Sequence, residues 1–177
     1  MTLVLAALLG VLGWTFTEYM FHRFLGHEYA KYTEFGTQHL QHHRDQDYFA
    51  PASAKAKLSV VVSVLIGLVA VPLAGWTHGV VFTASLVSSY LIYEFIHRDL
   101  HVRAPSGAYG RWARRHHMAH HHTSPGLNHG VTSPIWDIVF GTRTTSDSVR
   151  VPKAKAPVWL REAKDDRYAA DYQLFGR

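Results

Sequence analysis

The sequence predicts an all-α integral membrane protein, with about three transmembrane helices and a cytosolic, histidine-rich helical metal cap. Three observations in the 177 residues lead to this prediction: three apolar stretches of membrane-spanning length, basic residues on one side of them, and four histidine motifs at helical spacing. A chain of this length is expected to form one main domain. The mean hydropathy of −0.06 conceals the apolar stretches because polar segments offset them.

Each apolar stretch has 18 to 20 residues, close to the ~20 that cross a bilayer core as a helix. They cover residues 2–21, 58–76 and 79–96, and the second carries no charge. Glu18 and Glu94 are the charges in the other two, each near the end of its stretch. A buried helical hairpin in a soluble protein is the alternative interpretation.

The positions of the basic residues favour the membrane interpretation. The net charge is +5, and all 18 Lys and Arg lie either between the first and second stretches or after the third. They therefore share one side of a three-span topology, which the positive-inside rule makes cytoplasmic. The N-terminus and the turn near His78 are expected on the other side. Basic residues beside spans meet anionic lipid, so we expect no nucleic-acid partner.

We expect residues 1–145 to form a single membrane-embedded domain and residues 146–177 to form a charged C-terminal tail. Apolar side chains in the tail predict that it packs on the cap or the membrane surface; they are Trp159, Leu160, Tyr168 and Phe175. The chain has no cysteine, which excludes disulfides, thiolate metal sites and iron–sulfur clusters.

Ten of the 14 histidines lie in four motifs on the predicted cytoplasmic side. The motifs HRFLGH, HLQHH, HRDLH and HMAHH contain His22, His27, His39, His42, His43, His97, His101, His117, His120 and His121. At 3.6 residues per turn, positions i, i+3 and i+4 share a helix face, which aligns the histidines within each of the last three motifs. His22 and His27 are five residues apart and converge only where the helix ends or distorts, which Gly26 permits.

The arrangement occurs twice, since each half of the chain has a span, an exit motif and an HxxHH triad. Clustered imidazoles without a carboxylate cluster are typical of metal binding, which uses the neutral ring. Five plus five histidines indicate two metal ions. Imidazole suits zinc, iron, copper and nickel, but ten ligands exceed the needs of a zinc site, which favours iron and O2. A membrane metal-binding or transport protein is the non-enzymatic alternative, although the span centres lack the ionisable residues of a transport pathway.

The four motifs, followed by GVTSPIWDIVFGT, resemble in order and spacing the fatty acid hydroxylase/sterol desaturase superfamily of integral-membrane di-iron oxygenases. The last block resembles that of the fatty acid hydroxylase branch, and the resemblance covers about residues 16–142. It implies that residues 1–145 are a hydroxylase domain, that the ten histidines bind metal, and that the protein is an oxidoreductase of lipid metabolism. The implied reaction is the O2-dependent hydroxylation of a lipid, with a fatty acyl chain as the leading substrate. A carotenoid or sterol hydroxylase or desaturase of the same superfamily stays open.

The resemblance also implies cofactors and partners. They are two iron ions, O2, a lipid that enters from the membrane, and electrons from a separate protein of the ferredoxin or cytochrome b5 type. Zinc stands above ferrous iron in the usual affinity order and can replace it in a purified sample.

We predict that the outer histidines of each triad bind one metal and the middle one binds the other. One site then has His22, His27, His39, His43 and His120, and the other has His42, His97, His101, His117 and His121. Carboxylates often orient metal-bound imidazoles, and the candidates are Glu18, Asp45, Glu94, Asp99 and Asp137. We do not expect ligation by His78, His116, His122 or His129.

Overall fold

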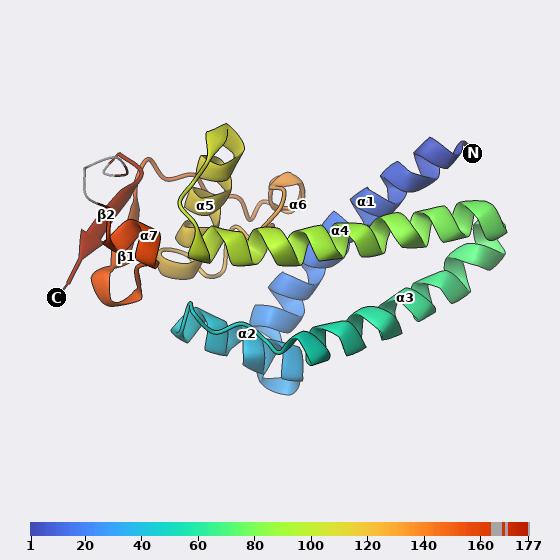
Figure 1. Ribbon diagram of the computed structural model, residues 1–177, viewed down its shortest axis with the longest axis horizontal. Helices are drawn as coiled ribbons and strands as arrows, with labels where there is room; N and C mark the ends of the chain where they lie inside the picture. The colour runs from blue at the N-terminus through green and yellow to red at the C-terminus, as the bar shows by residue number, and fades with distance from the viewer. Residues whose placement is uncertain (164–167, 169, 177) are drawn as a thin grey trace.

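Three long helices dominate the fold (Figure 1). The computed structural model describes residues 1–163, 168 and 170–176. Over these residues, three helical segments are long and apolar enough to cross a membrane: α1 (Leu3–Met20) with its continuation to Glu28, α3 (Ala52–Ala74) and α4 (Trp76–Val102). The predicted all-α fold with three spans is confirmed.

Helix α1 packs against α4 at a glycine. A Cβ on Gly10 would meet the Cβ of Ser85 at 2.9 Å and also the carbonyl oxygen of Phe82. The two backbones therefore approach more closely than a larger residue permits, as is common between membrane helices. Helix α3 runs antiparallel to α4 and diverges from α1 (Figure 1), so that side chains of α1, α3 and α4 line a shared space.

The N-terminus and the turn between α3 and α4 lie at the same end of the molecule (Figure 1). His78 Nε2 hydrogen-bonds the carbonyl oxygen of Met1 at 2.7 Å, which joins the two segments. The later helices and the tail lie at the opposite end. This arrangement agrees with the expected topology, in which the histidine motifs share one side.

A π-helical segment, η1 (Phe21–Glu28), continues α1. Its hydrogen bonds run from i to i+5, so residues five apart come to the same face. His22 and His27 consequently point the same way, with ring centroids 5.3 Å apart. The π-helix is the distortion that the spacing of this motif requires.

The chain then reverses through η2 (Ala30–Tyr32) into α2 (Glu34–Arg44), which carries the HLQHH motif. The Thr33 hydroxyl caps α2 by accepting a hydrogen bond from Gly36 N at 2.9 Å. A Cβ on Gly36 would overlap the backbone of Ala30, so glycine lets α2 start directly against the preceding turn. The second motif is thereby folded back beside the first.

Arg114 fixes α5 (Gly107–His122) to the end of α4. Its guanidinium donates to the Asp99 carboxylate at 2.6 Å, and to the carbonyl oxygens of Asp99 at 3.0 Å, Arg103 at 2.8 Å and Gly110 at 3.2 Å. The acceptors lie in the last turn of α4, in the residue that follows it, and in the first turn of α5. One buried side chain thus sets the position of the last two histidine motifs relative to each other.

The tail follows α6 (Ile135–Val139) and includes β1 (Val149–Pro152), η3 (Lys153–Lys155), α7 (Val158–Arg161) and β2 (Tyr172–Phe175). The two strands pair in parallel, with Val149 opposite Tyr172. No strand was expected from the sequence here, because two four-residue strands this far apart are too short to show a strand pattern.

The described part of the tail packs on α5. The shared core comprises Met118, Ala119, Val149, Val151, Ala156, Leu160 and Tyr172, with Trp159, Tyr168 and Leu174 beside it. Of the four tail residues expected to pack, Phe175 is instead 42% exposed. The other three, Trp159, Leu160 and Tyr168, pack on the cap in or beside this core. The boundary between residues 145 and 146 stays a prediction.

Candidate metal centre

The ten motif histidines lie in two groups of five. The His22 cluster contains His22, His27, His39, His43 and His120. The His97 cluster contains His42, His97, His101, His117 and His121. Within each, one nitrogen from every ring lies within 4.8 Å of the others. The grouping matches the predicted division, while metal binding itself stays a prediction.

Helical spacing produces this division. On α2, His39 and His43 are one turn apart and face η1, whereas the ring of His42 lies against His97 and His101 of α4. On α5, His120 contacts His27 while its neighbours in the triad face α4. Each triad therefore joins both clusters, which makes α2 and α5 the common walls of the site.

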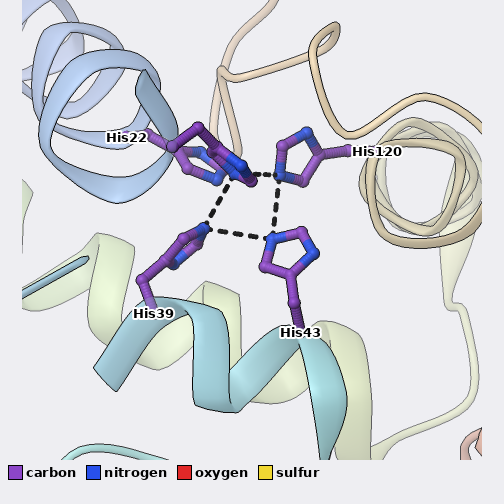
Figure 2. Close-up of side chains that lie close together, drawn as sticks. His22, His39, His43 and His120 are labelled. Atoms are coloured by element: carbon purple, nitrogen blue, oxygen red, sulfur yellow. Dashed lines mark hydrogen bonds between the residues drawn. The ribbon is translucent and has the colours of Figure 1, made fainter. Parts of the chain in front are cut away.

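In the His22 cluster, four Nε2 atoms form a closed ring (Figure 2). The Nε2–Nε2 distances are 3.0 Å for His27–His39, 3.0 Å for His39–His43, 3.2 Å for His43–His120 and 3.1 Å for His120–His27. In the His97 cluster the corresponding distances are 3.1 Å for His42–His101, 2.9 Å for His101–His117 and 3.1 Å for His117–His121. Nitrogens rather than ring carbons converge in both.

The residues of both clusters fit a metal ion. Over the described residues, Nε2 of His22 and of His97 is buried without a hydrogen-bond partner, which is uncommon and costly. Ligands on opposite sides of one ion lie ~4.2 Å apart, twice the length of a zinc–imidazole bond. The 4.8 Å spread of each cluster is close to that separation. A bound cation would satisfy the unpartnered nitrogen in each.

Backbone carbonyls orient three of the rings. Nδ1 of His22 lies 2.5 Å from the carbonyl oxygen of His129, Nδ1 of His42 lies 2.8 Å from that of Tyr48, and Nδ1 of His120 lies 2.7 Å from that of Leu127. A carbonyl oxygen only accepts, so each Nδ1 carries the proton and each Nε2 keeps its lone pair. That is the tautomer a metal at Nε2 requires.

Burial keeps the rings neutral. It lowers the pKa of His42 to about 4 and that of His43 to about 2. The pKa values of His39, His117, His120 and His121 also lie well below 6.5, first because of burial and then because neighbouring imidazoles repel a second charge. At neutral pH these side chains are therefore unprotonated and available as ligands.

These lowered pKa values predict acid sensitivity. The unfolded chain binds protons as the pH falls below about 6.5, whereas the folded clusters do not, so acid favours unfolding. We expect the thermal unfolding midpoint of the metal-free protein in detergent to drop between about pH 7.5 and about pH 5. His43→Gln should reduce the dependence on pH because it removes one such group. A midpoint that does not change over this range would contradict the explanation.

The five candidate carboxylates have partners other than the ten imidazoles. Glu18 accepts from Val131 N at 2.5 Å, Thr132 N at 2.9 Å and Thr132 Oγ1 at 2.6 Å. Asp137 accepts from the backbone N–H groups of His129 and Gly130, both at 2.8 Å. Both carboxylates thus hold the loop whose carbonyls orient His22 and His120.

The other three carboxylates bind groups outside this loop. Glu94 pairs with Lys55, Asp99 binds Arg114, and Asp45 accepts from Asp47 N at 3.1 Å. The orienting acceptors are instead the carbonyls of Tyr48, Leu127 and His129, which the sequence analysis missed. Every residue has a carbonyl, so no sequence pattern distinguishes these three. Among the described residues, neither cluster includes His78, His116, His122 or His129.

The fold and the site define a membrane protein with paired five-histidine clusters at one end of its spans. Residues 7–142 match the family model described as fatty acid hydroxylase. The chain belongs to the fatty acid hydroxylase family.

Relatives and a solved structure agree with this assignment. The chain is 32% identical over 141 residues to dihydroceramide fatty acyl 2-hydroxylase FAH2 of Arabidopsis thaliana, covering 75% of this chain and 58% of that protein. It is 31% identical over 147 residues to fatty acid 2-hydroxylase of Mus musculus, covering 76% of this chain and 38% of that protein. A solved structure described as full-length scs7p, with only its hydroxylase domain visible, has a TM-score of 0.66 and 28% identity, covering 84% of this chain and 60% of that one. The chain therefore spans less than two thirds of these proteins.

Proposed function

We propose that this protein is a di-iron monooxygenase that uses O2 to hydroxylate a fatty acyl chain of a membrane lipid, at carbon 2. The observation that carries the proposal is a cavity of about 410 Å³ between the spans, in the range of small-molecule sites. Apolar side chains of α1, α3 and α4 line most of it, and His22 lies in its wall. The names of the relatives support carbon 2 and an acyl substrate.

A smaller cavity lies beside the first, next to histidines of both clusters. A second cavity of about 60 Å³ shares Lys55, Tyr93 and Glu94 with the first and is also lined by His39, His42 and His97. A lipid chain could thus lie between the spans while its head end meets histidines of both groups. The lipid never needs to leave the apolar phase.

The ten histidines would hold two iron ions, which supply O2 activation and the oxidising power for C–H cleavage. The chain itself supplies neutral ligands, an apolar channel and an ion pair, Lys55–Glu94, where the two cavities meet. Electrons would come from a separate carrier of the ferredoxin or cytochrome b5 type. The basic residues on this side of the spans support a cytoplasmic location for the histidine clusters.

The lipids of cells that express the protein test this proposal by mass spectrometry. Acyl chains with one added oxygen, located at carbon 2 by fragmentation, are the expected result. Chains that lose two hydrogens would instead identify a desaturase. An unchanged lipid profile from metal-loaded protein supplied with reductant would contradict the proposal.

Ser63 of α3 provides a test of the cavity. It lines the wall, and Ser63→Phe would fill part of the space with an aromatic ring. We expect hydroxylation of long chains to fall at least about tenfold, with normal metal content, because an extra group in an apolar pocket strongly discriminates between substrates. Val64→Phe is the matched control, since Val64 is 55% exposed on the lipid-facing side. Equal activity in both variants would argue against the cavity as the substrate site.

A further inference from the structure

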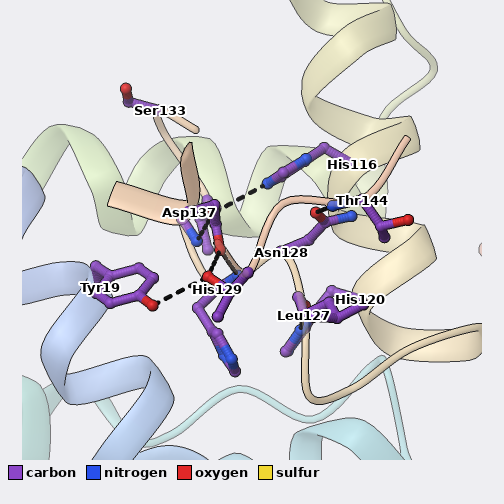
Figure 3. Close-up of polar contacts among 12 residues, drawn as sticks. Tyr19, His116, His120, Leu127, Asn128, His129, Ser133, Asp137 and Thr144 are labelled. Atoms are coloured by element: carbon purple, nitrogen blue, oxygen red, sulfur yellow. Dashed lines mark hydrogen bonds and ion pairs between the residues drawn. The ribbon is translucent and has the colours of Figure 1, made fainter. Parts of the chain in front are cut away.

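Asp137 is buried in the cap and its carboxylate receives several hydrogen bonds (Figure 3). Oδ1 accepts from His129 N and from Thr142 Oγ1, each at 2.8 Å. Oδ2 accepts from Gly130 N at 2.8 Å and lies 3.4 Å from Nε2 of His116. The side chain belongs to neither histidine cluster.

The peptide between His129 and Gly130 lies between this carboxylate and His22. Its N–H donates to Asp137 Oδ2 at 2.8 Å, and its C=O lies 2.5 Å from His22 Nδ1. In a trans peptide these two groups point in opposite directions. The carboxylate and the imidazole are therefore at the two ends of one peptide group.

Glycine at position 130 makes this contact possible. A Cβ there would lie 3.0 Å from Asp137 Oδ2 and would overlap the Ser133 carbonyl. The loop is also fixed to the helix of His22, because Glu18 lies one turn before His22 and binds Val131 and Thr132. The carbonyl of His129 is thus held in place from both sides.

We propose that Asp137 is a positioning residue that acts on the His22 ring through the His129–Gly130 peptide. A carboxylate that binds the N–H polarises the peptide, and linked hydrogen bonds strengthen one another. The polarised carbonyl then holds the proton on Nδ1 and increases the basicity of Nε2 toward a metal, as a directly bonded carboxylate does elsewhere. The inference rests on the proposed function in requiring a metal at the His22 cluster.

His120 offers an internal contrast. Its Nδ1 lies 2.7 Å from the carbonyl of Leu127, whose peptide N–H belongs to Asn128 and donates to the carbonyl of Thr142 at 2.9 Å. The N–H of that peptide therefore binds a neutral carbonyl rather than a carboxylate. Loss of the Asp137 carboxylate should therefore weaken metal binding through His22 and leave metal binding at the His97 cluster unchanged.

The test compares Asp137→Asn with Thr142→Val in the full chain in detergent. Asparagine removes the charge and cannot accept at both positions, whereas valine removes one hydrogen bond to Oδ1 and keeps the Gly130 contact. The readouts are the affinities of the two sites for Co²⁺ by chelator competition, the visible spectrum of bound Co²⁺, and thermal unfolding. These readouts do not depend on turnover.

For Asp137→Asn we expect one of two sites to weaken about 10–100-fold and its Co²⁺ spectrum to change, while the other site keeps its affinity. Thr142→Val should unfold at a lower temperature with both sites intact. The proposal would be overturned if both sites of Asp137→Asn bound Co²⁺ with wild-type affinity. It would also be overturned if the affinity of both sites fell equally. Wild-type protein that binds no metal would instead contradict the proposed function.

A second variant covers the case in which Asp137→Asn does not fold. Asp137→Ser is smaller and keeps one neutral acceptor, and the same selective loss is expected from it. Failure of both variants to fold would show that the carboxylate serves the fold and not His22 in particular, which would overturn the proposal.

Discussion

Replacing His39 with alanine is expected to abolish hydroxylation and to reduce bound metal from two ions per chain to one. His39 belongs to the closed nitrogen ring of the His22 cluster, so its loss opens that site and leaves the His97 cluster complete. His101→Ala should give the same result from the other cluster. Metal analysis of the purified variants, with turnover in parallel, measures both effects.

The double variant and a matched control complete this experiment. His39→Ala combined with His101→Ala should bind no metal at the site. His122→Ala should keep two ions, because His122 follows His121 in the chain but lies outside both clusters. Full metal and full turnover in either single variant would refute the division into two sites.

Replacing Arg114 with methionine is expected to destabilise the cap by about 3 kcal/mol, a shift of roughly 6–12 °C in the unfolding midpoint. The side chain is 3% exposed, and its removal takes one charged donor from the Asp99 carboxylate and from three backbone carbonyls. Because Arg114 joins α4 to α5, weaker metal binding at the His97 cluster should accompany the loss. Thermal unfolding in detergent measures the change.

Arg115→Met is the control for this prediction. Arg115 is the next residue along α5 and pairs with Asp171 at 3.2 Å, but its side chain is 40% exposed. Exposed ion pairs contribute about 0–1 kcal/mol, so little change is expected. Equal midpoints for the two variants would show that the buried network is not what joins the helices.

The spans and the division of the histidines could be predicted from the sequence because both depend on local periodicity. Apolar stretches of fixed length predict membrane helices, and the i, i+3, i+4 spacing places the three histidines of each triad near one face of a helix. The structure adds that His42 and His120 turn toward the other cluster than the outer histidines of their triads. Even the five-residue spacing of His22 and His27 indicated a helix distortion, which the structure shows as the π-helix η1.

The hydrogen bonds that orient the imidazole rings could not be predicted, because they involve backbone atoms and contacts between distant segments of the chain. The carbonyls of Tyr48, Leu127 and His129 orient three rings, yet nothing in their side chains indicates this. Asp137 was expected to bind an imidazole of the site directly, and it instead contacts the loop that does so. The strands β1 and β2 were not predicted for a similar reason, because they form only when two separate segments of the tail pair.

Hydroxylation under isotopically labelled O2 tests whether this protein transfers an oxygen atom from O2 to an acyl chain. Membranes containing the metal-loaded protein, a reducing system and lipid are incubated under labelled gas, and the acyl chains are analysed by mass spectrometry. We expect hydroxylated chains that carry one labelled oxygen at carbon 2, and we expect no such chains in His39→Ala or His101→Ala membranes. Unmodified chains, or product whose oxygen comes from water, would contradict this expectation.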